Sequence, residues 1–167
     1  MKFRKNTGKA LENLIAKQAR IMEGRGILRL EKVDPPTRTF TRGGRNITTL
    51  LANPFPDFIG CLPCGRMICI EAKSNQLKSL PIGDGGLREN QLSYLNEWLS
   101  AGAIVGIVWQ TPNAFKWVTL KDIGDALNSG RKSVPLSGAR DIPSKDGLIL
   151  NFVEFMDEQK NKAEVKI

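Results

Sequence analysis

Hydrophobic positions along the chain recur with different periods, and the period predicts the type of each element. Residues 7–23 place an apolar side chain at every third or fourth position, which is typical of a helix with one buried face. The same period in residues 88–102 directs Leu95 and Leu99 inward. Residues 26–33 alternate between apolar and polar side chains instead, and this pattern predicts a half-buried strand.

Shorter apolar runs predict further strands. Along the chain, the predicted elements then follow the order helix, three strands, helix, two strands, helix. The predicted helices cover residues 7–23, 88–102 and 121–128, and the predicted strands cover residues 26–33, 57–62, 66–73, 103–109 and 115–119. Residues 77–90 favour a loop, and a last strand is expected at 148–152. We therefore expect an α/β fold, a mixed β-sheet flanked by α-helices. A single domain is expected over residues 1–155, with a projecting basic loop or stalk at 37–53 and a charged tail at 156–167.

Two of the predicted strands are joined by the three residues Pro-Cys-Gly at 63–65, the length of a tight hairpin with glycine at its left-handed position. With the turn centred on its middle residue, residues whose numbers add to 128 face each other, which places Asp57 opposite Glu71. Lys73 lies two residues beyond Glu71 and projects from the same face of the sheet.

Two facing carboxylates repel each other at neutral pH unless a positive charge lies between them. A hard divalent cation, Mg²⁺ or Mn²⁺, suits oxygen ligands of this kind and can bring water to a phosphodiester. Lys73 is then placed to orient or deprotonate that water and to offset charge that grows on the phosphate. The alternative interpretation is a salt bridge at a strand edge among Asp57, Glu71 and Lys73.

The chain has three cysteines and no histidine. A structural zinc site needs four nitrogen or sulfur ligands, so we interpret the cysteines as small residues that fill space near the hairpin. A zinc site shared across a dimer stays open as an alternative. The absence of histidine removes the usual histidine-based acid and base schemes, which leaves metal-assisted hydrolysis without an organic cofactor.

Positive charge is concentrated at the start of the chain. Residues 1–45 carry 12 Lys or Arg against 4 Asp or Glu, so the whole net charge of +8 lies in this part. The asymmetry indicates contact with a polyanion, although a solvated basic face is the alternative. The candidate phosphate contacts are Lys2, Arg4, Lys5, Lys9, Arg38, Arg42 and Arg45.

No apolar run approaches the roughly 20 residues that span a bilayer, and the basic N-terminus lacks the apolar stretch of a signal peptide. We therefore expect no membrane partner and a cytoplasmic protein of a bacterial or phage-infected cell.

The stretch around the hairpin resembles the signature of PD-(D/E)xK nucleases, the restriction-endonuclease-like superfamily. The matching residues are Pro56-Asp57, thirteen intervening residues, and then Glu71-Ala72-Lys73. Residues 7–120 are similar more specifically to RecU-type Holliday-junction resolvases, in GKALENLI, EKVDPPT, the EAK strand, ENQLSYL and GAIVGIVW. The segment between the proline pair and Asp57 is shorter than the stalk of those resolvases.

The resemblance implies that Asp57 and Glu71 bind the metal, that Lys73 is the catalytic lysine, and that Gln91 and Glu12 complete the site. It also implies a homodimer that acts on branched DNA, with residues 37–53 engaging the junction. From the residues alone, Gln91 is equally suited to capping its helix. Without the resemblance, Glu12 is interpreted as a surface glutamate. The alternative functions are another nuclease of this fold, acting on duplex or flapped DNA, and a non-catalytic DNA-binding module.

Overall fold

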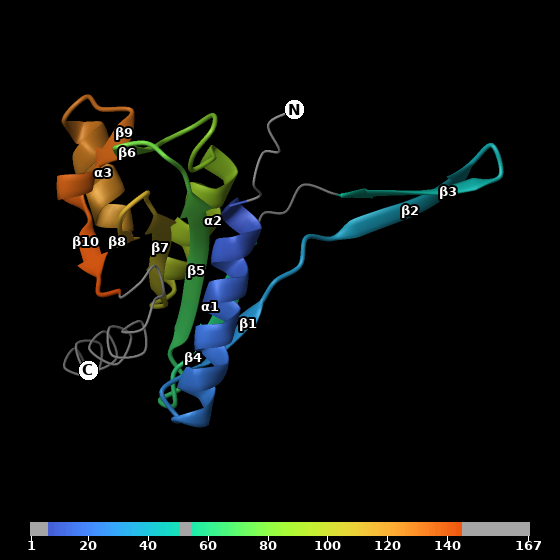
Figure 1. Ribbon diagram of the computed structural model, residues 1–167, viewed down its shortest axis with the longest axis horizontal. Coiled ribbons are helices and arrows are strands. Elements are labelled where there is room, and N and C mark those ends of the chain that lie inside the picture. Colours follow the sequence, from blue (N-terminus) through green and yellow to red (C-terminus); the bar gives the residue numbers. More distant parts are fainter. Residues whose placement is uncertain (1–6, 51–54, 145–167) are drawn as a thin grey trace.

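The computed structural model describes residues 7–50 and 55–144, which are built around a six-stranded sheet (Figure 1). Its strands, in their order across the sheet, are β1 (Arg29–Lys32), β4 (Phe58–Cys61), β5 (Met67–Ser74), β7 (Ile104–Gln110), β8 (Phe115–Val118) and β10 (Arg140–Ile142). Strands β5 and β7 run parallel, and the other neighbours are antiparallel. The sheet is therefore mixed, as the sequence predicts.

Three α-helices flank this sheet within the described residues: α1 (Thr7–Gly24), α2 (Glu89–Ser100) and α3 (Leu120–Asn128). Two pairs of strands lie outside it. Strand β6 (Ser79–Pro81) pairs with β9 (Ser133–Pro135), which is followed by a 3-10 turn at Leu136–Gly138. Strands β2 (Thr37–Arg42) and β3 (Arg45–Leu50) form an antiparallel ribbon that extends away from the body (Figure 1).

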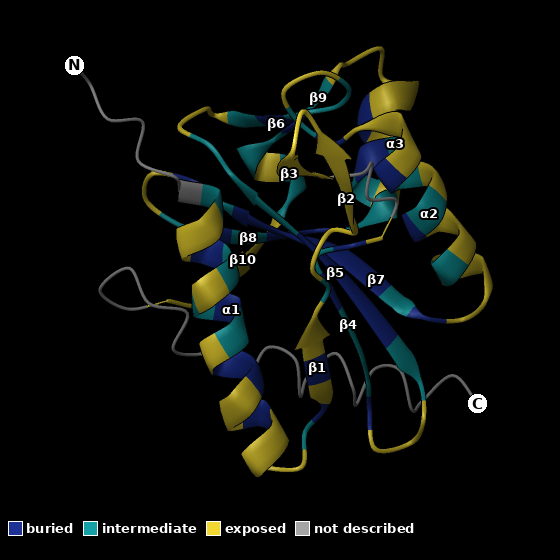
Figure 2. Cartoon of the chain, turned by 90° about the vertical axis from the view of Figure 1, so that its right-hand side faces the viewer, coloured by how far each residue is buried: buried dark blue, intermediate teal, exposed yellow. Residues whose placement is uncertain are grey.

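The sheet is covered on both faces, which gives a three-layer sandwich. On one face, Leu11, Ile15 and Met22 of α1 pack against Ile68 and Ile70 of β5. On the other face, α2 and α3 cover the opposite side chains of β5 and β7 in a second core. The central strands are consequently the most buried part of the chain, whereas the β2–β3 ribbon is exposed along the part whose burial is described (Figure 2).

The hairpin between β4 and β5 has the predicted register. Ile59 pairs with Cys69, and Leu62 N–H donates to Arg66 O at 2.8 Å. The residue numbers in each facing pair therefore add to 128, as predicted. Gly65 supplies the expected left-handed backbone, with φ of 83°. A side chain there would strain the turn.

Other sequence predictions need correction. The helix bounds agree within two residues, but residues 77–90, predicted as a loop, contain the short strand β6, and β9 and β10 were not predicted. These strands have only three residues each, too few for a periodic signal. Leu99 is 43% exposed instead of buried, because it lies at the edge of the apolar stripe in the last turn of α2. The predicted strand at 148–152 and the tail at 156–167 lie outside the described residues.

Within the described part of the chain, no helix has the length and apolar character needed to cross a membrane.

Candidate active site

The fold brings together Asp57, Glu71, Lys73 and Gln91, which the sequence singles out. Asp57 directly precedes β4, Glu71 and Lys73 lie on the neighbouring strand β5, and Gln91 lies in the first turn of α2. Asp57 Oδ2 accepts a hydrogen bond from the Ala72 backbone N–H at 2.8 Å, which fixes this carboxylate against β5. The hairpin register is therefore the device that places the two carboxylates side by side, as predicted.

Glu71 is the most constrained member of the site. It is only 1% exposed, and its Oε1 atom accepts from Gln91 Nε2 and lies 2.9 Å from Lys73 Nζ. Its second oxygen, Oε2, is buried and has no hydrogen-bond partner among the described residues. A buried carboxylate oxygen without a partner is costly, so it indicates a place for a ligand that the polypeptide does not supply.

Gln91 connects the sheet to the start of α2. While its Nε2 atom donates to Glu71, its Oε1 atom accepts from Lys73 Nζ at 3.1 Å and from the Arg88 backbone N–H at 3.3 Å. One side chain therefore caps the helix and also contacts two residues of the candidate site.

The electrostatic environment makes the carboxylates hard to ionise without a cation. Burial, and next the nearby charge of Asp57, raise the pKa of Glu71 to about 7, although Lys73 and Arg88 oppose the change. Burial also raises the pKa of Asp57, against the effect of its hydrogen bond from Ala72. A divalent cation at this point would offset the cost of holding both groups ionised.

Glu12 lies beside this centre and is paired. Its Oε2 atom is 3.1 Å from Lys32 Nζ, and its charge helps to raise the pKa of Asp57. Lys32 pairs across the sheet with Phe58, the residue after Asp57, and its charge lowers the pKa of Asp57. Sequence reasoning missed Lys32, because the pairing of β1 with β4 that brings it to Asp57 has no local signal.

The donor set fits a divalent cation that keeps several waters. Within residues 7–50 and 55–144, no three or more Cys, Asp or Glu residues gather as a preformed metal cage. Mg²⁺ does not need one, because it is commonly held by one or two carboxylates together with substrate phosphates. Asp57 and the unpartnered Oε2 atom of Glu71 match that pattern.

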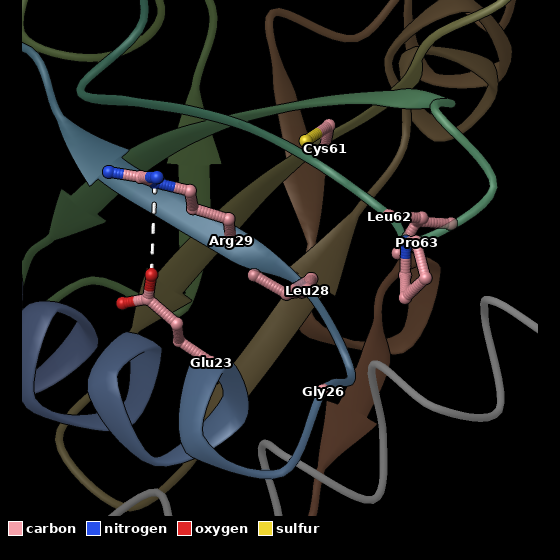
Figure 3. Close-up of a pocket in the computed structure, with 7 residues that line it drawn as sticks. All are labelled: Glu23, Gly26, Leu28, Arg29, Cys61, Leu62 and Pro63. Carbon is pink, nitrogen blue, oxygen red and sulfur yellow. Dashed lines mark ion pairs between the residues drawn. The ribbon is translucent and has the colours of Figure 1, made fainter.

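The three cysteines are free thiols in different surroundings. Cys69 is buried in the core below α2 and α3, as a space-filling residue should be, whereas Cys64 is exposed in the turn and fills no space. Cys61 lines a cavity of about 210 Å³ between the end of α1 and the hairpin (Figure 3). At the edge of this cavity, Arg29 Nε lies 3.7 Å from Glu23 Oε1. The residues that line the cavity do not include Asp57, Glu71, Lys73 or Gln91.

The basic candidates divide between the ribbon and the N-terminus. Strand pairing sets Arg42 opposite Arg45 and Phe40 opposite Ile47, so these four residues share one face of the ribbon with Arg38. Hydroxyl and amide groups occupy the other face, where Thr39 Oγ1 and Thr48 Oγ1 lie 2.9 Å apart and Thr41 donates to Asn46 at 2.8 Å. Lys9 is exposed on α1, and Lys2, Arg4 and Lys5 lie outside the described residues.

Comparisons with known proteins gave similarity of shape only. No family model and no curated protein matches the chain. Among solved structures, the chain is similar to Hjc, a Holliday junction resolvase from the archaeal hyperthermophile Archaeoglobus fulgidus, with 13% identity and a TM-score of 0.46 over 70% of this chain and 75% of that one. It is also similar to the protein SSO0001, with 13% identity and a TM-score of 0.36 over 96% of this chain and 61% of that one. Both TM-scores are below 0.5, so the function has to be inferred from the residues of the site.

Proposed function

We propose that this protein is a metal-dependent endonuclease that hydrolyses phosphodiester bonds in branched DNA. The observation that carries the proposal is the buried Oε2 atom of Glu71, which has no hydrogen-bond partner within residues 7–50 and 55–144 and lies beside Asp57, Lys73 and Gln91. Two carboxylates and a lysine on adjacent strands are the residue types that metal-assisted phosphodiester hydrolysis needs.

Each residue has a distinct task. Asp57 and Glu71 hold Mg²⁺, with Mn²⁺ as a substitute, and the Ala72 N–H and Gln91 keep their carboxylates oriented. The bound ion supplies polarisation of the phosphate and a more acidic water. Lys73 orients the attacking water and offsets the charge that grows on the phosphate oxygens. Gln91 also holds Lys73 Nζ at 3.1 Å, so loss of Gln91 affects two groups at once.

Selectivity for four-way junctions rests on the ribbon and on the resemblance to RecU-type resolvases. The ribbon places Arg38, Arg42 and Arg45 on one exposed face at a distance from the sheet, where they can follow a nucleic-acid backbone (Figure 1). Resolution of a four-way junction requires two incisions, and a two-fold homodimer supplies two active sites.

The alternatives differ in the DNA that is cut or in the absence of cutting. Another nuclease of the restriction-endonuclease-like fold would act on duplex or flapped DNA. A non-catalytic DNA-binding module would have no use for two carboxylates facing a phosphate backbone, and the raised pKa of Glu71 reflects the cost of burying its charge beside Asp57.

The test is to incubate the protein with a labelled four-way junction and with a linear duplex of matching sequence, each with Mg²⁺ and with EDTA. We expect paired nicks in the junction with Mg²⁺, little cutting of the duplex, and none with EDTA. Equal cutting of both DNAs supports the duplex nuclease, and binding without cutting supports the binding module. Glu71→Gln serves as the control for a contaminating nuclease.

A further inference from the structure

A row of three aromatic side chains lies beside the candidate active site. The rings of Phe55 and Tyr94 meet edge to face, with centroids 5.2 Å apart and planes at 76°. The Tyr94 and Trp98 centroids are 6.0 Å apart, and Trp98 packs against the core below α2. The row is therefore anchored in the core at one end, whereas Phe55 at the other end is 40% exposed.

The chain ties both members of the outer pair to the site. Phe55 lies two residues before Asp57, so their Cα atoms can be at most about 7 Å apart. Tyr94 lies three residues after Gln91 in α2, and side chains at this spacing are neighbours on one helix face, with Cβ atoms about 5–6 Å apart. The pair is thus held from two elements that each carry a residue of the site.

This position differs from that of other exposed apolar residues. Leu99 is exposed to a similar degree on α2, at 43%, but lies two turns from Gln91 near the far end of the helix. Edge-to-face packing on Tyr94 restricts the orientation of the Phe55 ring, so a ligand that stacks on it meets a preformed surface. Among the exposed aromatic rings of the described residues, Phe55 lies nearest in sequence to a residue of the site.

We propose that Phe55, supported by Tyr94, stacks on one unpaired base of the nucleotide next to the phosphodiester held at Asp57 and Glu71. This inference rests on the proposed nuclease function and makes its substrate more specific. A base inside a duplex is already stacked on both faces, whereas an unpaired base at a branch point, bulge or flap has a face to offer. The DNA strand that enters the site brings such a base with it, because the base and the scissile phosphate belong to adjoining nucleotides.

The test compares removal of the ring with removal of the base. Single-turnover cleavage rates are measured for the wild type and for Phe55→Ala. The substrates are a junction with all bases present and junctions with an abasic nucleotide, placed in turn at each position flanking the mapped cut. Stacking of a base on an aromatic side chain strengthens binding, so removal of either partner should lower the single-turnover rate at subsaturating protein by about 5- to 150-fold. We expect a loss of this size for Phe55→Ala on the intact junction, a similar loss for the wild type at one abasic position, and no further loss when the two are combined.

A control variant separates stacking from a general effect on packing. Leu99→Ala removes a comparably exposed apolar side chain from α2 and should leave the rates unchanged. The stacking proposal would be overturned if the rate losses multiply when Phe55→Ala acts on the abasic junction, or if Phe55→Ala cuts the intact junction as fast as the wild type. Either result would leave the proposed nuclease function standing. Failure of the wild type to cut any DNA with Mg²⁺ would instead remove the proposed function itself, and the stacking proposal with it.

Discussion

Gln91 of α2 and Glu71 of β5 are joined by a direct hydrogen bond inside the protein, from Gln91 Nε2 to Glu71 Oε1. The bond fixes the start of a helix to the centre of the sheet and directs the carboxylate. Because Lys73 Nζ lies 2.9 Å from the same oxygen, Oε1 is fully engaged, and only Oε2 remains for a ligand. One carboxylate is thus divided between a fixed oxygen that orients the site and an oxygen that can bind a metal.

Loss of either carboxylate should abolish cleavage and preserve DNA binding. Asp57→Asn or Glu71→Gln removes a proposed metal ligand, and metal catalysis contributes several kcal/mol, so the rate should fall about a thousandfold or more. Binding should stay constant or tighten, because the variant no longer has a negative charge that repels phosphate. Cleavage assays and gel shifts on the same DNA measure the two effects.

Asp125→Asn is the matched control, because Asp125 is an exposed carboxylate of α3 that pairs with Lys121 one turn away, outside the candidate site. It should change neither cutting nor binding. Parallel loss of both activities in the site variants, together with an altered circular dichroism spectrum, would indicate misfolding instead of a missing metal ligand.

Stability without metal should fall as the pH rises. The pKa of Glu71 is raised from 4.5 to about 7, so between these values the folded chain holds a proton that the unfolded chain has released. The free energy of unfolding therefore decreases across this window, by about 3 kcal/mol, and stays low above pH 7. Urea unfolding in EDTA at pH 5 and pH 8 measures the change.

Glu71→Gln removes this titration, so its stability should depend less on pH, and it should exceed that of the wild type at pH 8. Metal binding requires the ionised carboxylate, so wild-type affinity for Mg²⁺ should rise through pH 7. Identical pH profiles for the two proteins would show that Glu71 does not titrate in this range.

Lys73→Ala should keep the metal and lose turnover. The Lys73 side chain is 20% exposed, and its amine contacts both Glu71 and Gln91, but a protonated amine does not bind a metal. Calorimetric titration with Mg²⁺ or Mn²⁺ at pH 8.5, above the pKa of Glu71 in the wild type, should show binding close to that of the wild type. The cleavage rate should fall about a hundredfold or more, as expected when one group that stabilises transition-state charge is removed. Absence of metal binding in this variant would assign Lys73 a structural role.

The sequence predicted the parts of the site that depend on local chain geometry. A three-residue turn with Gly65 fixes the register of its strands, so the approach of Asp57 to Glu71 followed from counting residues. The place of Gln91 in the site was implied by the resemblance to RecU-type resolvases. Lys32 could not be found in this way, because it reaches Asp57 through the pairing of β1 with β4, two strands separated in sequence by the whole ribbon.

The same distinction explains the errors in the fold. The periodic helix α1 and the continuous apolar run of β7 were predicted within two residues, because many consecutive side chains carry the signal. Strands β6 and β9 exist because they pair with each other across more than fifty residues, and three-residue strands carry no periodic signal of their own. The aromatic row of Phe55, Tyr94 and Trp98 likewise depends on tertiary contact between a loop and α2.

The ribbon should determine how the protein distinguishes junctions from duplexes. Arg42 and Arg45 face each other beside the turn, and with Phe40 and Ile47 they form the charged and apolar face of the ribbon. If this tip recognises branch structure, replacing both arginines by alanine weakens binding to a four-way junction much more than binding to a duplex. If it binds only phosphates, both affinities fall together. The salt dependence of log K then flattens by about one unit for each arginine–phosphate pair removed.

Gel shifts across a salt series, with junction and duplex of the same sequence, distinguish these outcomes. Arg131→Ala with Lys132→Ala is the matched control, because it removes the same charge from two exposed residues between α3 and β9, outside the ribbon. The control should shift both affinities slightly and equally, through the net charge alone. Unchanged affinity of the Arg42 and Arg45 variant for both DNAs would exclude the ribbon from the interface and leave the basic residues at the start of the chain, including Lys9, as the main DNA-binding surface.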